Sequence, residues 1–237
     1  MSSSINHFPK LHADLAPIST KMIDNIAYEG VDIRAMVAEE LRTKYCKEKA
    51  KIIDLCCGVG FSTRALTYAF PDAEKVVGVD TSPQMLAMAR FISAHVCHLG
   101  PMVENVFKNQ GKKIKAGARN ILSTSFLRGN AESTPFENGS FDVVTIMYAF
   151  HEAPKKGRQR ILEEARRLLS PGGVLAVIDI SSEYQPSESM LAGEPYVIEY
   201  QKNIHKQLGT QRGFYQPQYK NLVPGHVGMW LLRKSMA

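Results

Sequence analysis

The chain lacks the features that would assign it at once to a membrane, secreted or metal-binding class. No run of about 18 apolar residues occurs, so no membrane-spanning helix is expected. The start, Met-Ser-Ser-Ser, has neither the charged nor the apolar segment of a secretory signal. Only four cysteines are present, without a C-x-x-C spacing, which disfavours a zinc site or a redox pair. We therefore expect a cytoplasmic protein with reduced thiols and no bound metal.

A concentrated charge of one sign is also missing. The formal net charge is +6, but the basic residues are scattered, and their densest groups lie in 108–119 and 155–160. A mild basic excess of this kind is more typical of a solvated surface than of a nucleic-acid-binding face. Nucleic acid is therefore disfavoured as a partner.

The N-terminal part of the chain differs in pattern from the rest. Residues 1–17 are expected to form a flexible arm. Apolar residues at helical spacing follow Asp32, a residue type that caps helices, so 18–48 is predicted to be a helical cap. We assign 18–237 to a single domain. Within it, 101–119 is longer than a usual connection, which suggests an insertion or a lid, with an ordinary surface loop as the alternative.

From Lys51 onward, short apolar strands alternate with amphipathic helices. The expected strands are 52–55, 76–80, one within 121–128, 141–147 and 174–180, followed by a hairpin of 214–222 and 226–233. Ser170-Pro171-Gly172-Gly173 is expected to separate a helix from a strand, and a helix over 187–208 is expected to be interrupted near Gly193 and Pro195. The alternation predicts an α/β fold with a doubly wound, mostly parallel seven-stranded sheet that ends in an antiparallel C-terminal hairpin. Ligands of such sheets bind beyond the carboxyl ends of the strands.

The strongest functional signal is a strand, a glycine turn, a helix and a second strand that ends in an acid. The turn runs from Asp54 to Gly60 and contains Gly58, and Asp80 ends the next strand. Small residues let the backbone approach a ligand, the helix start offers free N–H groups, and a carboxylate at Asp80 can accept both hydroxyls of a ribose. Thr63 occupies the place where a dinucleotide-binding turn would have its third glycine, so a pyrophosphate ligand is disfavoured.

These segments resemble the successive motifs of the class I S-adenosylmethionine-dependent methyltransferases. The matching segments are Ile52–Thr63, Val76–Ser82, Asn130–Phe136, Phe141–Pro154 and Leu168–Asp179. The similarity is greatest to the small-molecule branch that includes quinone-biosynthesis enzymes, and it covers about residues 50–180. It implies a Rossmann-like methyltransferase fold, S-adenosyl-L-methionine as the cofactor, S-adenosyl-L-homocysteine as the product and a small-molecule methyl acceptor.

The resemblance also implies a cofactor role for each matching position. Gly58 and Gly60 would approach the methionine and ribose parts, Asp54 would hold the amino group directly or through water, and Asp80 would bind the ribose diol. Cys56 stands where the family has the first glycine of the turn, and we expect it to be tolerated because its side chain is small.

The remaining cofactor positions follow the later strands. Thr81 or Met85 would pack on the adenine, and Asn130 with Ala131 would read its edge. Met147 would line the sulfonium end of the site.

Methyl transfer is an in-line displacement, in which the protein mainly positions donor and acceptor, and a base is needed only if the acceptor atom must lose a proton. His151, with Glu152 beside it, follows the central strand and is the candidate catalytic pair. The alternative is that His151 only hydrogen-bonds a loop carbonyl. Asp179 is a weaker second candidate.

Aromatic residues are the candidates for the acceptor pocket. Tyr148 ends the central strand, and Tyr28, Tyr196 and Tyr200 could form part of an aromatic wall. Tyr196 and Tyr200 are four residues apart and would share one face of a helix. Ordinary packing is the competing interpretation.

Other functions are compatible with parts of the pattern. A nucleic-acid or protein methyltransferase of the same fold is one alternative, although an Asn/Asp-Pro-Pro-aromatic motif and a paired-glutamate loop are both missing. A nicotinamide-dependent oxidoreductase and a non-catalytic S-adenosylmethionine-binding protein are others. The acceptor atom stays open, as does the choice between monomer and homodimer.

Overall fold

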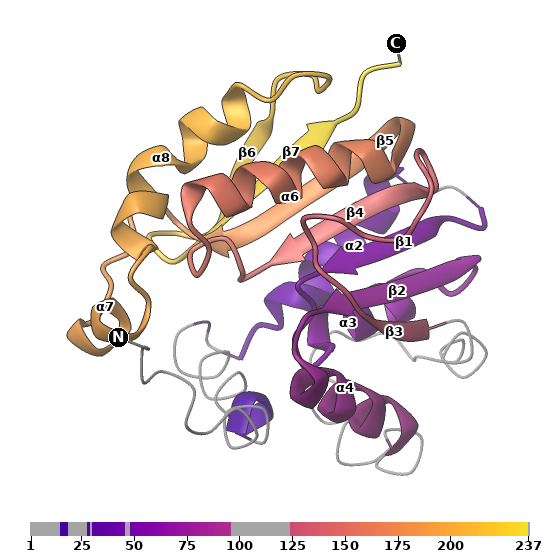
Figure 1. Ribbon diagram of the computed structural model, residues 1–237, viewed down its shortest axis with the longest axis horizontal. Helices are drawn as coiled ribbons and strands as arrows, with labels where there is room; N and C mark the ends of the chain where they lie inside the picture. Colours follow the sequence, from indigo (N-terminus) through magenta and orange to yellow (C-terminus); the bar gives the residue numbers. More distant parts are fainter. Residues whose placement is uncertain (1–14, 19–27, 29, 46–47, 96–123, 237) are drawn as a thin grey trace.

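Seven strands form one sheet, in the order β3-β2-β1-β4-β5-β7-β6 (Figure 1). The computed structural model describes residues 15–18, 28, 30–45, 48–95 and 124–236. The strands are β1 (Lys51–Leu55), β2 (Lys75–Asp80), β3 (Thr124–Arg128), β4 (Phe141–Met147), β5 (Leu169–Ile180), β6 (Gln218–Val223) and β7 (Val227–Arg233). The strands from β3 to β5 are parallel, and β7 runs antiparallel to both β5 and β6. The predicted sheet and its closing hairpin are confirmed.

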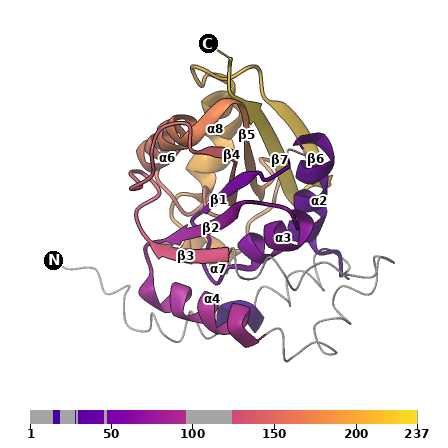
Figure 2. The same ribbon diagram turned by 90° about the vertical axis from the view of Figure 1, so that its right-hand side faces the viewer.

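Helices cover both faces of this sheet. They are α2 (Ile33–Tyr45), α3 (Phe61–Ala69), α4 (Pro83–His95), α6 (Lys155–Leu168), α7 (Glu188–Gly193) and α8 (Val197–Gly209). One buried cluster joins α6 and α8 to the sheet, and a second joins α2 and α3 to it, so the two pairs lie on opposite faces (Figure 2). The central strands β1 and β4 are buried almost throughout, as expected for strands covered on both sides.

Two local predictions, the Asp32 cap and the helix interruption near Gly193, are confirmed, and Ser82 provides a further cap. Asp32 Oδ1 accepts a hydrogen bond from Ala35 N at 2.9 Å, which caps α2. Ser82 Oγ does the same for Met85 N at 3.2 Å, at the start of α4. The helix expected to be interrupted near Gly193 and Pro195 is divided into α7 and α8.

The break predicted at residues 170–173 is wrong. These residues belong to β5, which begins at Leu169 and pairs with β4 through a register shift, since Phe141 faces Leu169 whereas Val143 faces Val174. Gly172 has a φ of 74°, and a Cβ on Gly173 would lie 2.9 Å from the carbonyl oxygen of Asp142. The glycines therefore let the strand bulge without leaving the sheet.

On α4, Leu86 is fully buried, whereas Met85 and Met88 are only half-buried. The predicted lid at 101–119 and all of the predicted arm except residues 15–17, which are helical, lie outside the described residues. Among the described helices, none is long and apolar enough to cross a membrane.

Candidate active site

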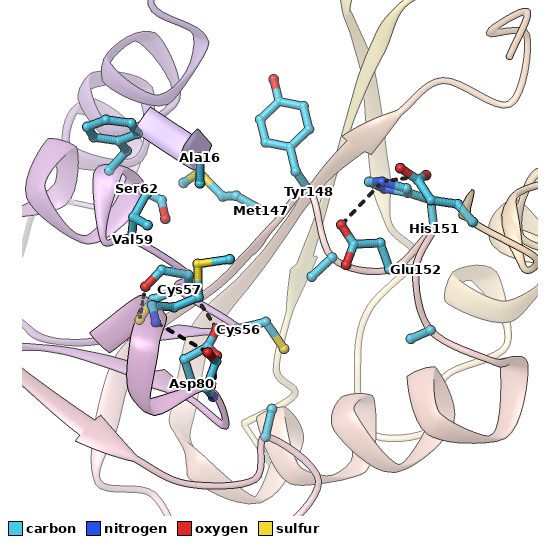
Figure 3. Close-up of a pocket in the computed structure, with 18 of the residues that line it drawn as sticks. Ala16, Cys56, Cys57, Val59, Ser62, Asp80, Met147, Tyr148, His151 and Glu152 are labelled. Atoms are coloured by element: carbon cyan, nitrogen blue, oxygen red, sulfur yellow. Dashed lines mark hydrogen bonds and ion pairs between the residues drawn. The ribbon is translucent and has the colours of Figure 1, made fainter. Parts of the chain in front are cut away.

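A cavity of about 1010 Å³ lies at the carboxyl ends of β1, β2, β4 and β5. Its wall includes the glycine turn after β1, the end of β2, and the loop after β4 (Figure 3). Residues of α2, of the loop before α7 and of α7 itself also line the cavity. The position agrees with the rule that ligands of doubly wound sheets bind at this edge.

The turn after β1 is held in a backbone conformation that favours glycine. Gly58 and Gly60 have φ values of 53° and 78°. A Cβ on Gly60 would lie 2.7 Å from the Phe126 ring, so Gly60 is required by packing at the start of α3, and it does not line the cavity. Gly58 does line the cavity, and its Cβ would meet no atom within 4 Å. The open space at Gly58 is available to a ligand.

Cys56 lines the cavity at the first position of the turn. Its φ is 59°, a conformation that costs a non-glycine residue free energy. Burial, reinforced by the charges of Asp80 and Asp54, raises the pKa of the Cys56 thiol to about 12. The thiol is therefore protonated and unreactive near neutral pH.

Asp80 connects the turn to the end of β2. Its Oδ2 accepts a hydrogen bond from Gly58 N at 2.8 Å, and its Oδ1 accepts one from Ser82 N at 2.9 Å (Figure 3). A carboxylate has about four acceptor positions, so each oxygen keeps one for a ligand. Asp80 lines the cavity, as predicted.

Asp54 does not line the cavity, so of the two predicted ways of holding the ligand's amino group, directly or through water, the structure gives no support to the direct one. The side chain is fully buried, and Oδ2 accepts hydrogen bonds from the hydroxyls of Ser62 and Thr63, both at 2.6 Å. Oδ1 accepts one from Thr145 at 2.7 Å. Burial raises the pKa of Asp54, and the three hydroxyl groups oppose that rise. Asp54 therefore joins β1, α3 and β4 beneath the turn.

The predicted adenine-binding residues follow β2 and β3, which are neighbours in the sheet. Thr81, Met85, Asn130 and Ala131 all line it. Asn130 Oδ1 accepts a hydrogen bond from Glu132 N at 2.9 Å, which fixes the loop after β3. Met147 lines the cavity at the end of β4, where the prediction placed it.

His151 lies at the other end of the cavity, and a carboxylate holds it there. Nδ1 makes a short hydrogen bond to Oδ1 of Asp179, a fully buried residue near the end of β5. Asp179 Oδ2 also accepts hydrogen bonds from the backbone N of Phe150 at 2.8 Å and of His151 at 3.1 Å. The partner of His151 is thus this carboxylate, and the alternative of a loop carbonyl is wrong. Asp179 positions the ring.

Two further carboxylates face the opposite ring nitrogen. His151 Nε2 lies 3.3 Å from Glu194 Oε2 and 3.8 Å from Glu152 Oε1. Burial lowers the pKa of His151, but the charge and hydrogen bond of Asp179, with the charges of Glu152 and Glu194, outweigh burial and raise it to about 9.

The four tyrosines predicted for the acceptor pocket divide into two pairs. Tyr28 and Tyr148 line the cavity, and the Arg34 guanidinium lies 4.7 Å from the centre of the Tyr148 ring. Tyr196 and Tyr200 do not line it. Tyr200 is buried and donates its hydroxyl hydrogen to Ile180 O at 2.8 Å, whereas Tyr196 lies exposed at the start of α8. The face of α8 with Tyr200 packs against the core. The prediction of a helix here was correct, but the prediction that Tyr200 points toward the acceptor pocket was wrong.

Several cavity residues were not predicted. Arg34 from α2, Met190 from α7, and Glu194 all line the cavity. They come from segments without a recognisable motif, and no periodic pattern marks them. The sequence shows the interruption between Gly193 and Pro195. It does not show that Glu194, the residue between them, lines the cavity, because that depends on where α7 lies.

Comparison with known proteins gives the family. The family described as a methyltransferase domain matches residues 53–177, more than half of the chain. A demethylmenaquinone methyltransferase of Lactococcus lactis is 36% identical over 135 residues, which cover 57% of this chain and 44% of that protein. The chain spans about half the length of the curated relatives it matches.

Solved structures share the fold at low identity. A SAM-dependent methyltransferase of Aquifex aeolicus has a TM-score of 0.61 and 19% identity, with 92% of this chain and 98% of that chain covered. A [4+2]-cyclase has a TM-score of 0.58 and 14% identity, with 86% and 81% covered. These likenesses extend to the fold alone, since the same fold can carry different chemistry.

Proposed function

The chain belongs to the family of methyltransferase domains, and on that premise we propose that it transfers a methyl group from S-adenosyl-L-methionine to a small-molecule acceptor. The observation that carries the proposal is that the glycine turn and Asp80 open onto the same cavity as His151. A volume of about 1010 Å³ is at the upper end for small-molecule pockets, so it has room for a cofactor and an acceptor together.

The cofactor end fits an adenosine ligand in its donor and acceptor groups. Asp80 keeps acceptor positions for the two ribose hydroxyls, and the open space at Gly58 lets the backbone lie against the methionine part. Asn130 and Ala131 would contact the adenine edge, with Thr81 or Met85 packed on its face.

When bound, S-adenosylmethionine supplies a methyl carbon that the sulfonium has already activated. The protein must then hold the acceptor in line and keep water away. Met147 lies between the two ends of the cavity, and Tyr148, Tyr28 and His151 form the wall of the acceptor end, with Glu152 beside them. Because Asp179 fixes Nδ1, Nε2 is the ring atom of His151 that would contact the acceptor.

The product would be S-adenosyl-L-homocysteine, and its formation tests the proposal. Purified protein is incubated with S-adenosylmethionine and single acceptors from a panel of phenols, quinols, amines and thiols, and S-adenosylhomocysteine is quantified. We expect acceptor-dependent formation that His151→Ala reduces. If S-adenosylhomocysteine forms with none of these acceptors but does form with a nucleic acid or a protein, the acceptor is a macromolecule and the proposed small-molecule class is wrong. The cytoplasmic location and the choice between monomer and homodimer stay predictions.

A further inference from the structure

Three metal-ligating side chains converge at the acceptor end of the cavity. One ligand atom from each of His151, Glu152 and Glu194 lies within 4.8 Å of the other two. His151 and Glu152 come from the loop after β4, and Glu194 caps the end of α7. All three residues line the cavity. They form a cluster, His151–Glu152–Glu194, that the sequence did not indicate, because Glu194 follows Glu152 by 42 positions and the cluster includes no cysteine.

The environment of the His151 ring favours a cation at Nε2. Asp179 accepts the hydrogen of Nδ1, so when a metal ion displaces the proton at Nε2, the ring presents the Nε2 lone pair beside the two glutamates. Electron-rich atoms in such an arrangement repel one another unless a positive centre lies between them. Glu194 Oε2 is closed to solvent, and it accepts no hydrogen bond from any residue that the structure describes.

We propose that His151, Glu152 and Glu194 bind one divalent transition-metal ion, with Asp179 orienting the imidazole. A carboxylate that accepts the second ring hydrogen is the usual partner of a metal-binding histidine. Ligand atoms about 2.1 Å from a tetrahedral ion are about 3.4 Å apart, and the distances from His151 Nε2 to the glutamates are 3.3 and 3.8 Å. One nitrogen and two carboxylate ligands suit zinc or manganese.

The ion would have an open coordination position toward the cavity, as catalytic metal sites do. This chemical use rests on the proposed function, although ion binding itself does not. The ion would lower the pKa of an acceptor hydroxyl bound to it, so that hydroxyl would release its proton to solvent at a lower pH than the free acceptor does. Its oxygen would then form a bond to the methyl carbon while the carbon–sulfur bond breaks and its electron pair stays on sulfur.

The test is calorimetric titration of chelator-treated full-length protein with MnCl2 and, separately, with ZnCl2. We expect one ion per chain, and a loss of affinity of at least about tenfold in Glu194→Gln and in Glu152→Gln. Glu188→Gln is the matched control, because Glu188 is an exposed carboxylate in the first turn of the same helix α7 and does not line the cavity. It should bind as the wild type does. Circular dichroism checks that each variant is folded. The Glu152 side chain is 64% exposed, so Glu152→Gln should have little effect on folding.

A second readout identifies the imidazole. Pulsed electron paramagnetic resonance of the Mn2+-loaded protein should show coupling to a histidine nitrogen. Absence of stoichiometric binding of either ion would mean that a proton alone occupies Nε2 and would overturn the proposal. Binding that neither glutamate variant weakens would overturn it as well. The titration needs neither cofactor nor acceptor, so cofactor binding by the metal-free protein would still support methyl transfer if the metal site failed.

Discussion

The two ends of the cavity are built in different ways. At the cofactor end, Asp80 and the backbone N–H groups of Gly58 and Ser82 form one small unit within a short stretch of chain. At the acceptor end, the polar groups are side chains from separate segments, with His151 held by Asp179 and facing Glu194. The comparison teaches that one end depends on backbone conformation and a single carboxylate, whereas the other depends on tertiary placement of several charged groups.

The largest effect is expected from removing the one carboxylate of the cofactor end. Asp80→Ala should weaken S-adenosylmethionine binding by at least about 100-fold, because two hydrogen bonds to a charged group are each worth about 1.5–3 kcal/mol. Calorimetry measures the affinity, and circular dichroism confirms the fold. Asp80→Asn keeps the shape of the side chain, so its affinity for S-adenosylmethionine should lie between those of the wild type and Asp80→Ala. Unchanged affinity in Asp80→Ala would remove the basis for assigning this end to the cofactor.

At the acceptor end, the same kind of change should affect turnover instead. His151→Ala should reduce turnover by about 100-fold, within the usual range for a group that assists proton transfer or its equivalent, while cofactor affinity changes little. Steady-state rates and calorimetry on the same preparation give both values. A variant that lost cofactor binding as strongly as turnover would show that the two ends are not separate.

The two glycines of the turn should respond differently to the same substitution. Gly60→Ala should lower the free energy of unfolding by about 2–3 kcal/mol, because its Cβ would strike the Phe126 ring as well as adopt a left-handed conformation. Gly58→Ala should lower it by only about 1 kcal/mol, since its Cβ meets open space, but should weaken cofactor binding. Urea unfolding and calorimetry separate the two effects, and equal destabilisation would contradict the packing argument.

The smallest effect is expected from Tyr200→Phe. The change removes the hydrogen bond to Ile180 O and should cost about 1 kcal/mol of folding free energy. The Michaelis constant for the acceptor should stay within about twofold, because Tyr200 does not line the cavity. A strong rise in that Michaelis constant, without loss of stability, would indicate that Tyr200 contacts the acceptor after all.

The sequence allowed prediction where neighbouring residues act together. The mostly parallel sheet follows from alternating patterns and was predicted correctly, and the turn and Asp80, contained in about 30 consecutive residues, were placed at the same cavity. The hydrogen bonds of Asp54 to Ser62, Thr63 and Thr145 could not be inferred from spacing, because these hydroxyl groups come from α3 and β4.

Prediction failed where tertiary packing decides direction. The spacing of Tyr196 and Tyr200 indicates a helix, but not which face of that helix packs against the sheet. The glycines at 172–173 are as compatible with a bulge as with a loop, and pairing with β4 decides between them. Glu194 becomes a site residue only because α7 is placed beside the loop after β4.

The most direct test of the central claim is parallel calorimetric titration of the wild-type protein with S-adenosylmethionine, S-adenosylhomocysteine and NADH. The account predicts micromolar binding of the first two and none of NADH, because the turn has no third glycine for a pyrophosphate. Binding of NADH alone, or of none of the three, would contradict the assignment of this cavity to an S-adenosylmethionine-dependent reaction.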